Sequence, residues 1–331
     1  MTYQEHFMKL FAEKKNLFTA IIGQAKSKEE LKSALLTNRH VLIHGPPGIG
    51  KTTLVKTVAE LLPDEIDEKG NKITAQDRFI RVQGSPDLTA EDLLGDIDPV
   101  KALKYGPLSK EAFEPGKIFK ADKGILFFDE VNRCSEKLQN ALLQSLEEGI
   151  VTIGSYDVDL PADFIFIGTI NPHDSSTEKL NEAFMDRFDI IEMDYPETAN
   201  IEERILLQNA QKLPITFPDK LVKFIIEYIR NLRNPSKLSK FPSVRATIGV
   251  FERASANAII RKNEEVTLRD VKDTFQSVLA HRIELKPSLK YLITPEDFVK
   301  EEFEKLAKAH QIPPAEYEDE EDEVGDEPNY T

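Results

Sequence analysis

A loop of eight residues constrains this chain more than any other feature of its sequence. His40–His44 has the pattern of a short buried strand, and Lys51–Leu62 has the apolar spacing of a helix. The residues between them fit G-x-x-x-x-G-K-[ST] in the run Gly45-Pro46-Pro47-Gly48-Ile49-Gly50-Lys51-Thr52. Glycines here let backbone amide groups turn inward around phosphates, and the following helix adds the positive end of its dipole. We therefore expect a phosphate-binding loop, with Lys51 on the β- and γ-phosphates and Thr52 as a ligand of Mg²⁺.

Further apolar runs predict the sheet around this loop. They alternate with helical stretches such as Glu136–Leu146, and they occupy Phe79–Val82, Ile125–Phe128, Phe164–Gly168 and Ile190–Met193. Strands that alternate with helices indicate a parallel sheet with helices on its faces, so the sequence predicts a doubly wound α/β domain over residues 1–195. Two inserts interrupt this domain, a segment rich in Pro, Gly and Asp at about 84–117 and a hairpin at about 149–162.

From residue 196 onward the sequence predicts helices alone. Helical spacing is found in Ile201–Ala210, Lys220–Leu232, Val244–Ile260, Leu268–Leu279 and Pro295–Ala309. We expect these segments to form a smaller all-α domain over residues 196–312. Residues 313–331 begin with two prolines and are strongly acidic, so they offer too little apolar surface to offset the entropy of ordering. The sequence predicts a disordered tail there.

Charge and composition narrow the class of protein. The net charge is −15, and the nine acidic residues within 316–331 leave a net charge of −6 for the other residues. This net charge does not indicate a nucleic-acid-binding protein, although it is compatible with a locally basic groove. Cys134 is the only cysteine, which excludes an intramolecular disulfide and any multi-cysteine metal site. No apolar run approaches the roughly 18–20 residues of a membrane span, and the start lacks a signal-peptide layout, so we expect a cytoplasmic protein.

Polar residues follow two of the predicted strands. Asp129 and Glu130 end the apolar run at Ile125–Phe128, and Asn171 ends the next one. In open α/β sheets ligands bind at the carboxyl ends of strands, so Asp129 is placed to hold Mg²⁺ through water and Glu130 to deprotonate an attacking water. Asn171 is placed to sense a γ-phosphate or to position that water, or else only caps the turn before Pro172.

These motifs, with Asp186-Arg187-Phe188 and Ser243-Val244-Arg245-Ala246, occur in the order and at about the spacing found in AAA+ ATPases. More narrowly, the chain resembles the MoxR and magnesium-chelatase ATPase-subunit group. The narrower resemblance is carried by Gly84-Ser85-Pro86-Asp87-Leu88, Leu93-Leu94-Gly95-Asp96, Phe113-Glu114-Pro115-Gly116-Lys117-Ile118, Glu130-Val131-Asn132-Arg133 and the run Leu142–Gly154. It extends from Ile22 to about Ala280.

The resemblance implies a role for each motif. It implies a P-loop NTPase core of the AAA+ type followed by a lid, with Asp129 and Glu130 as the Walker B pair and Asn171 as the sensor 1 residue. Arg187 would be the arginine finger and Arg245 the sensor 2 arginine. The segment around Ile22 would lie beside the adenine, and the Walker A residues would be Gly45, Pro46, Gly48, Ile49, Gly50, Lys51, Thr52 and Thr53. Residues 84–117 would be the helix 2 insert, and 149–162 the hairpin before sensor 1.

The leading functional hypothesis is an ATP-hydrolysing remodelling chaperone that uses ATP, ADP and Mg²⁺. An arginine finger acts on a neighbour's site in AAA+ proteins, so the resemblance implies a ring of identical subunits, expected to be a hexamer. It suggests a client protein, with a von Willebrand factor A domain in some relatives, that is remodelled, assembled or loaded with metal. Three alternatives stay open, namely a nucleic-acid motor, a magnesium-chelatase subunit, and an ATP-dependent switch with little turnover.

Overall fold

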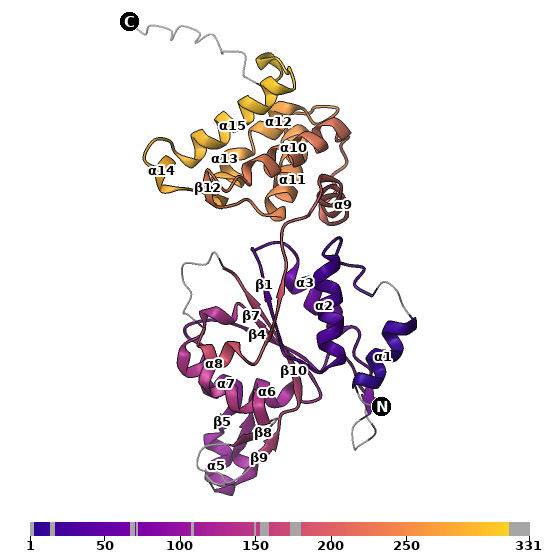
Figure 1. Cartoon of the computed structure of the whole chain (residues 1–331), viewed down its shortest axis with the longest axis vertical. Coiled ribbons are helices and arrows are strands. Elements are labelled where there is room, and N and C mark those ends of the chain that lie inside the picture. The colour runs from indigo at the N-terminus through magenta and orange to yellow at the C-terminus, as the bar shows by residue number, and fades with distance from the viewer. Residues whose placement is uncertain are drawn as a thin grey trace, which may run out of the picture. The chain divides into compact units, whose positions relative to one another are not determined.

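The computed structural model describes residues 3–13, 17–66, 70, 72–106, 109–148, 150–152, 159–172 and 180–317. The chain divides into two compact units, Met1–Asp194 and Tyr195–Thr331 (Figure 1). Each unit has its own apolar core, and each is described by itself below.

The first unit is built around a parallel sheet of five strands in the order β11-β1-β10-β7-β4. All four pairs of neighbouring strands are parallel. The strands are β1 (Val41–His44), β4 (Phe79–Gln83), β7 (Gly124–Asp129), β10 (Phe164–Ile170) and β11 (Asp189–Glu192). Every residue of β7 and β10 is buried, as expected for strands covered on both faces. The predicted parallel sheet flanked by helices is confirmed.

Alternation along β1 explains how both faces of the sheet are covered. Val41 and Ile43 join a core formed with α1 (Tyr3–Glu13), α2 (Ala25–Leu36) and α3 (Lys51–Ala59). Leu42 points to the other face and joins Phe128 and Phe166. Residues of α6 (Lys117–Lys120), α7 (Glu136–Glu148) and α8 (Glu182–Met185) complete that second core (Figure 1).

Short two-stranded antiparallel ribbons lie outside this five-stranded sheet. The insert consists of α4 (Ala90–Leu94), β5 (Gly95–Ile97), α5 (Pro99–Tyr105), η1 (Lys110–Ala112) and β6 (Phe113–Pro115), with β5 paired to β6. A second ribbon pairs β8 (Ile150–Thr152) with β9 (Asp159–Pro161), and the turn of this predicted hairpin lies outside the described residues. A third pairs β2 (Glu65–Ile66) with β3 (Lys72–Ile73).

The second unit is a helical domain whose core surrounds Tyr228 and Phe303. Its helices are α9 (Ala199–Asn209), α10 (Asp219–Leu232), α11 (Val244–Ile260), α12 (Leu268–Lys272), α13 (Phe275–Val278), η3 (Ala280–Arg282), α14 (Pro287–Lys290), α15 (Pro295–Ala309) and η4 (Pro314–Glu316). Across the described part of both units, no helix is long and apolar enough to cross a bilayer.

Three details of this unit differ from the sequence prediction. A short antiparallel ribbon, β12 (Leu238–Lys240) with β13 (Glu284–Leu285), interrupts the run of helices. The single helix predicted over 268–279 is two helices, because the Thr274 hydroxyl donates to the Val271 carbonyl at 2.7 Å at the break.

The third difference is that the predicted disordered tail begins too early at residue 313. Tyr317 is 2% exposed and packs edge-on against Phe303, with ring centroids 5.1 Å apart. The Lys272 ammonium group lies 5.1 Å from the centre of the Tyr317 ring. The ordered domain therefore includes residues 313–317, and the acidic residues 318–331 lie outside the described residues.

Candidate active site

The predicted phosphate-binding loop, Gly45–Thr52, connects the end of β1 to the start of α3, as the sequence predicts. Gly48 and Gly50 have φ angles of 76° and 100°, which side chains rarely adopt. Gly45 is required for a different reason, because a Cβ atom there would lie 2.1 Å from the Met193 carbonyl oxygen. Lys51 folds back over the loop and donates to the carbonyls of Gly45 at 2.5 Å and Pro46 at 2.8 Å. The loop thus presents a positive helix end and an ammonium group at one edge of the sheet.

Asp129 is the last residue of β7 and the centre of the polar contacts at this edge. Its carboxylate accepts from the Thr169 hydroxyl at 2.6 Å and from the Thr52 hydroxyl at 3.4 Å. Arg81, in the neighbouring strand β4, forms an ion pair with it at 2.7 Å. Thr52 follows Lys51 in the first turn of α3, so the loop, the helix and β7 bring a hydroxyl and a carboxylate together.

This pair of oxygen ligands fits a magnesium ion. Mg²⁺ is bound in phosphate-transfer sites by one or two protein oxygens, with phosphate oxygens and water completing its octahedron. No group of three His, Cys, Asp or Glu side chains that could hold a metal occurs in the described ranges. The hydroxyl of Thr52 and the carboxylate of Asp129 therefore fit an ion that takes its remaining ligands from phosphate and water.

Glu130 follows Asp129 in a left-handed backbone conformation, with φ of 56°. Its amide donates to the Thr169 hydroxyl at 2.9 Å, so one threonine contacts both acidic residues. The Glu130 carboxylate accepts from the Gln83 amide at 3.0 Å and pairs with Arg133 at 3.1 Å. Two neighbours thus orient the Glu130 carboxylate, and a third, Thr169, holds its backbone amide where the chain turns away from the strand.

Gly84 makes this arrangement possible because it lies against the backbone of both acids. Its amide donates to the Asp129 carbonyl at 2.7 Å. A Cβ atom at this glycine would lie 2.1 Å from the Glu130 carbonyl oxygen and 3.0 Å from that of Asp129. The end of β4 can therefore approach the acids only without a side chain.

Asn171 follows β10 at the same edge of the sheet, as the sequence predicts. Its carbonyl accepts from the Asn132 side-chain amide at 3.2 Å. Asn132 is 6% exposed, and its Oδ1 has no hydrogen-bond partner among the described residues. A buried polar side chain is thereby placed directly beside Asn171.

The segment around Ile22 lies next to the loop. The Cδ1 atom of Ile21 would be 3.1 Å from a Cβ atom placed on Gly50. Gly23 and Gln24 both have left-handed backbones, with φ of 74° and 56°, and they lead into α2. The predicted base-side residues therefore adjoin the loop that is predicted to hold the phosphates.

Arg187 lies at the opposite edge of the sheet from Asp129. Arg187 precedes β11, and the first residue of β11, Asp189, pairs with the first residue of β1. Arg187 therefore lies where these strands begin, whereas the loop follows the last residue of β1. Its guanidinium donates to the Ala183 carbonyl at 3.2 Å. It lines a cavity of about 470 Å³ with Asn38, Arg39, His40, Leu146 and Asp186. The structure thus places Arg187 beside Asp186, at 3.8 Å, and not beside Asp129 and Glu130 of its own unit.

Arg245 belongs to the second unit, where it is exposed in the first turn of α11. Arg282 is its neighbour, and burial together with the charge of Arg245 lowers the pKa of Arg282 below its ordinary value. The charges of the two arginines act on each other, and positive charge at this position suits an anionic ligand.

Several of these contacts are not evident from the sequence motifs. Arg81 and Gln83 lie in or directly after a predicted apolar strand, and their spacing of two places both on one face of β4. Thr169 is a polar residue in an otherwise apolar run, and that interruption is the one signal of its role.

A family model described as "ATPase family associated with various cellular activities (AAA)" matches residues 40–190. A model of the AAA lid domain matches residues 240–302. The chain belongs to the AAA ATPases.

Curated relatives agree with this AAA assignment. The uncharacterized protein YeaC of Bacillus subtilis is 27% identical, over 88% of this chain and 92% of that protein. Chaperone MoxR1 of Mycobacterium tuberculosis is 26% identical, over 89% and 83%. A magnesium-chelatase subunit ChlI homolog of Methanocaldococcus jannaschii is 28% identical, over 82% and 86%. The chain is thus an AAA ATPase related to MoxR chaperones and to ChlI subunits.

A solved structure shares the AAA fold. A point mutant of RuvB from Thermotoga maritima is 21% identical, with a TM-score of 0.51 over 78% of this chain and 72% of that chain.

Proposed function

We propose that this chain is a MoxR-like, Mg²⁺-dependent ATPase that hydrolyses ATP in a ring of identical subunits to remodel or assemble client proteins. The observation that carries the proposal is the convergence of Lys51, Thr52, Asp129 and Glu130 at one sheet edge. Phosphoryl transfer to water uses a lysine on the phosphates, a hydroxyl and a carboxylate on Mg²⁺, and a further group that orients the attacking water.

Each side chain has a role that follows from its position. Lys51 would exchange its two carbonyl acceptors for oxygens of the β- and γ-phosphates. Thr52 and Asp129 would hold Mg²⁺, which neutralises charge on the phosphate oxygens when bound. Gly45, Pro46, Gly48, Ile49, Gly50 and Thr53 would complete the nucleotide site, with Ile22 beside the base of ATP or ADP.

Glu130 would act as the general base. A water molecule attacks the γ-phosphorus, the bond to the ADP oxygen breaks, and the water proton passes to the Glu130 carboxylate. Gln83 and Arg133 hold that carboxylate in place at 3.0 and 3.1 Å. Asn171, at the same edge, would position the water.

Arg187 would complete the site of a neighbouring subunit. The sheet register separates it from the acids of its own unit, which supports a role in trans. Identical subunits joined head to tail in this way close into a ring, and we propose a hexamer. Arg245, with Arg282 beside it, would supply positive charge from the lid.

The remodelling role is supported by the relationship to the protein named chaperone MoxR1. Two apolar side chains of α5, Val100 and Leu103, are 75% and 91% exposed and could contact a client protein, such as one with a von Willebrand factor A domain. A role as a magnesium-chelatase ATPase subunit is the second candidate, because relatives named ChlI match over most of the chain.

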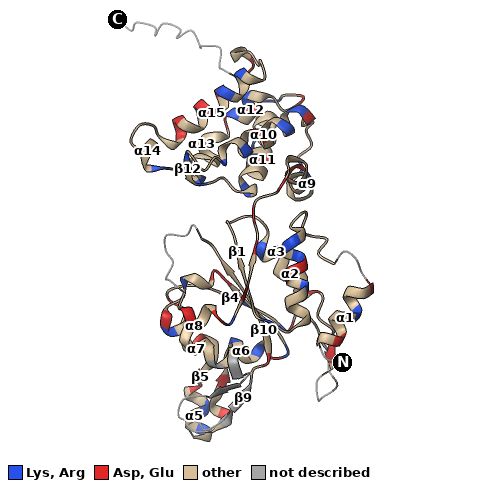
Figure 2. Ribbon diagram, in the orientation of Figure 1, with Lys and Arg blue, Asp and Glu red and all other residues tan. Residues whose placement is uncertain are grey.

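A nucleic-acid motor is less well supported. Lys101, one of the basic residues of the insert, pairs with Glu114 at 2.9 Å, so its charge is locally balanced. Figure 2 shows acidic and basic residues together around α5. We therefore expect duplex DNA to leave ATP turnover unchanged.

A complementation assay tests the proposal. Glu130→Gln and Arg187→Ala should each lower turnover by about 10²-fold or more while ATP still binds, and Glu182→Gln, an exposed acid of α8, should not. Mixing the two inactive variants should restore part of the activity, because some sites then pair an intact Glu130 with a neighbour's intact Arg187. Wild-type turnover by Glu130→Gln would exclude this base, and a mixture without recovery would exclude shared sites.

A further inference from the structure

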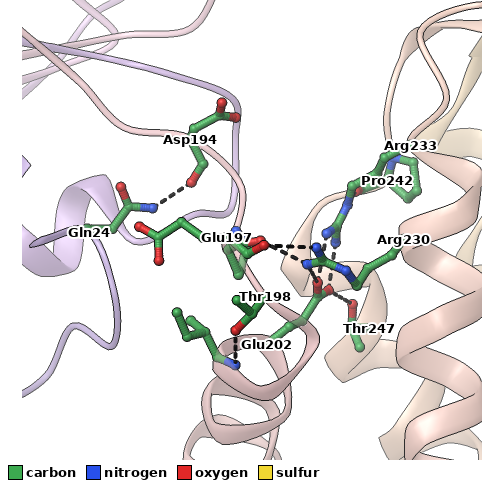
Figure 3. Close-up of polar contacts among 11 residues, drawn as sticks. Gln24, Asp194, Glu197, Thr198, Glu202, Arg230, Arg233, Pro242 and Thr247 are labelled. Carbon is green, nitrogen blue, oxygen red and sulfur yellow. Dashed lines mark hydrogen bonds and ion pairs between the residues drawn. The ribbon is translucent and has the colours of Figure 1, made fainter. Parts of the chain in front are cut away.

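A buried carboxylate joins three helices of the second unit. Glu202, on α9, is 0% exposed and accepts two hydrogen bonds from the Arg233 guanidinium at the end of α10, both at 2.7 Å. It also accepts from the Thr247 hydroxyl of α11 at 2.7 Å and from Arg230 of α10 at 3.4 Å (Figure 3). Both carboxylate oxygens therefore have partners from outside α9.

This network determines where the helices lie along one another. Desolvation of a buried ion pair offsets most of the attraction between its charges, so such a pair is weak evidence for stability. The same three helices also share an apolar cluster, formed by Leu206, Val222, Ile226 and Phe251. Apolar contacts have no direction, whereas hydrogen bonds require a defined distance and angle. The bonds of Glu202 therefore restrict how far α11 can slide along α9.

The start of α11 depends on this network because it has no cap of its own. Ser243 stands at the N-cap, but its side chain accepts no capping hydrogen bond from a described residue. Instead, Arg233 donates through Nε to the Pro242 carbonyl at 2.9 Å, just before the helix. Thr247, at the end of the first turn, bonds Glu202. One guanidinium thus holds the residue before α11 directly and the end of its first turn through Glu202.

Arg245 lies between these two fixed points. From Pro242 to Thr247 it is the only exposed residue, and the others are buried. Its backbone is thus held on both sides while its side chain faces solvent. Arg282 carries a like charge that acts on Arg245, so a loosely held helix start would let the two arginines move apart.

We propose that Glu202, Arg233 and Thr247 are positioning residues that fix the first turn of α11, and thereby the point from which Arg245 leaves the surface of the lid. Arg245 then meets an anionic ligand without the entropic cost of ordering a helix start at the same time. That this ligand is the nucleotide rests on the proposed function, whereas the fixing of α11 does not.

Substitutions at Thr247 separate its hydroxyl from its packing. Thr247→Val removes the hydroxyl at nearly the same shape, and Thr247→Ser keeps it. Arg233→Lys keeps a positive charge but loses the planar fork that bonds Glu202 and Pro242 together. Ser255→Ala is the matched control, because it removes another buried hydroxyl of α11, one that is bonded within the helix and not to Glu202.

Hydrogen exchange in the full chain without nucleotide tests whether the network fixes α11. The amides of residues 246–249 should exchange about two- to tenfold faster in Thr247→Val and in Arg233→Lys, since one lost hydrogen bond has this value. Thr247→Ser and Ser255→Ala should keep the wild-type rates there. Amides of α15 are the internal reference for general destabilisation. Wild-type rates in both Thr247→Val and Arg233→Lys, or equal acceleration in Ser255→Ala, would overturn the proposal.

ATP turnover then tests whether the network acts through Arg245. Thr247→Val should lower kcat/KM for ATP about two- to tenfold in the wild-type background, and by less than about twofold when Arg245→Ala is also present. Equal losses in both backgrounds, as from a merely structural role, or no loss in either, would overturn the action through Arg245. If the wild type has no turnover, the proposed ATPase function fails, while the exchange rates still decide whether the network fixes α11.

Discussion

Gly84→Ala should disable hydrolysis without disabling nucleotide binding. The added Cβ atom would lie 2.1 Å from the Glu130 carbonyl oxygen, whereas real Cβ contacts essentially never fall below 3.0 Å. The strand ends must therefore separate by about 0.9 Å, because the Cβ position is fixed by the backbone of residue 84 and the atoms that it meets are backbone atoms of Glu130 and Asp129, which cannot rotate away. A shift of about 1 Å in a catalytic group costs roughly 10²-fold in rate, or about 2.7 kcal/mol in the barrier.

The assay compares turnover with nucleotide affinity in this variant. The predicted phosphate-binding loop leaves β1, which β10 and β7 separate from β4, so ADP affinity should stay within about twofold while kcat falls about 10²-fold. Gly106→Ala is a control for backbone strain alone: Gly106 has φ of 94°, which alanine rarely adopts, but its added methyl group meets no atom within 4 Å and lies in the insert, so kcat should stay at the wild-type value. Wild-type kcat in Gly84→Ala would refute the positioning argument, and an equal loss of ADP affinity would show general damage instead.

Three further predictions concern contacts outside the motifs. Arg81→Met removes the cation paired with Asp129, so the Mg²⁺ concentration for half-maximal turnover should fall about two- to fivefold, and a rise would contradict competition between the two cations. A chain ending at Tyr317 should keep full stability, whereas Tyr317→Ala should lose about 3 kcal/mol in urea unfolding; equal stability of the two would show that the ring contributes nothing. Burial favours a higher pKa at Asp270, but hydrogen bonds from Thr267, Arg261 and Asn263 outweigh it and hold the pKa below the ordinary value. The stability from this carboxylate is therefore present at neutral pH and lost as pH falls below about 4, so Asp270→Asn should destabilise the lid at pH 7 and less so in acid, as urea unfolding at a series of pH values would measure. A difference from wild type that grows in acid would reverse this sign.

The sheet could be predicted because its strands carry strong local signals. β7 and β10 contain the apolar runs Ile125–Phe128 and Phe164–Ile167, which are buried on both faces of the sheet. The spacing of the loop before α3 predicts the strand that precedes it and the helix that follows it. The break between α12 and α13 could not be predicted in this way, because it depends on a side-chain bond of Thr274 inside an otherwise helical pattern. The burial of Tyr317 could not be predicted either, because it depends on α15, well before it in the chain.

The candidate site was predictable in its motifs and not in its supporting residues. Asp129 and Glu130 follow a strand whose end must face the loop, so their placement needs only topology. The two acids are contacted from the neighbouring strands by Arg81, Gln83 and Thr169. The register between those strands cannot be predicted from the sequence of any single segment. Arg282, whose pKa burial and the charge of Arg245 lower, belongs to η3 and not to α11, so its effect could not be predicted from the motif around Arg245.

The Lys51 ammonium group already donates to two acceptors within the loop, so a ligand must bind it more strongly than these acceptors do. A ligand must offer more than the two neutral carbonyls of Gly45 and Pro46 before the ammonium group exchanges partners. A chain of phosphates supplies several charged oxygens at once, and charged acceptors bind about twice as strongly as neutral ones. A single inorganic phosphate supplies fewer contacts and gains little over the bonds that it replaces. A loop with these resting bonds would therefore favour polyphosphate ligands over a single inorganic phosphate.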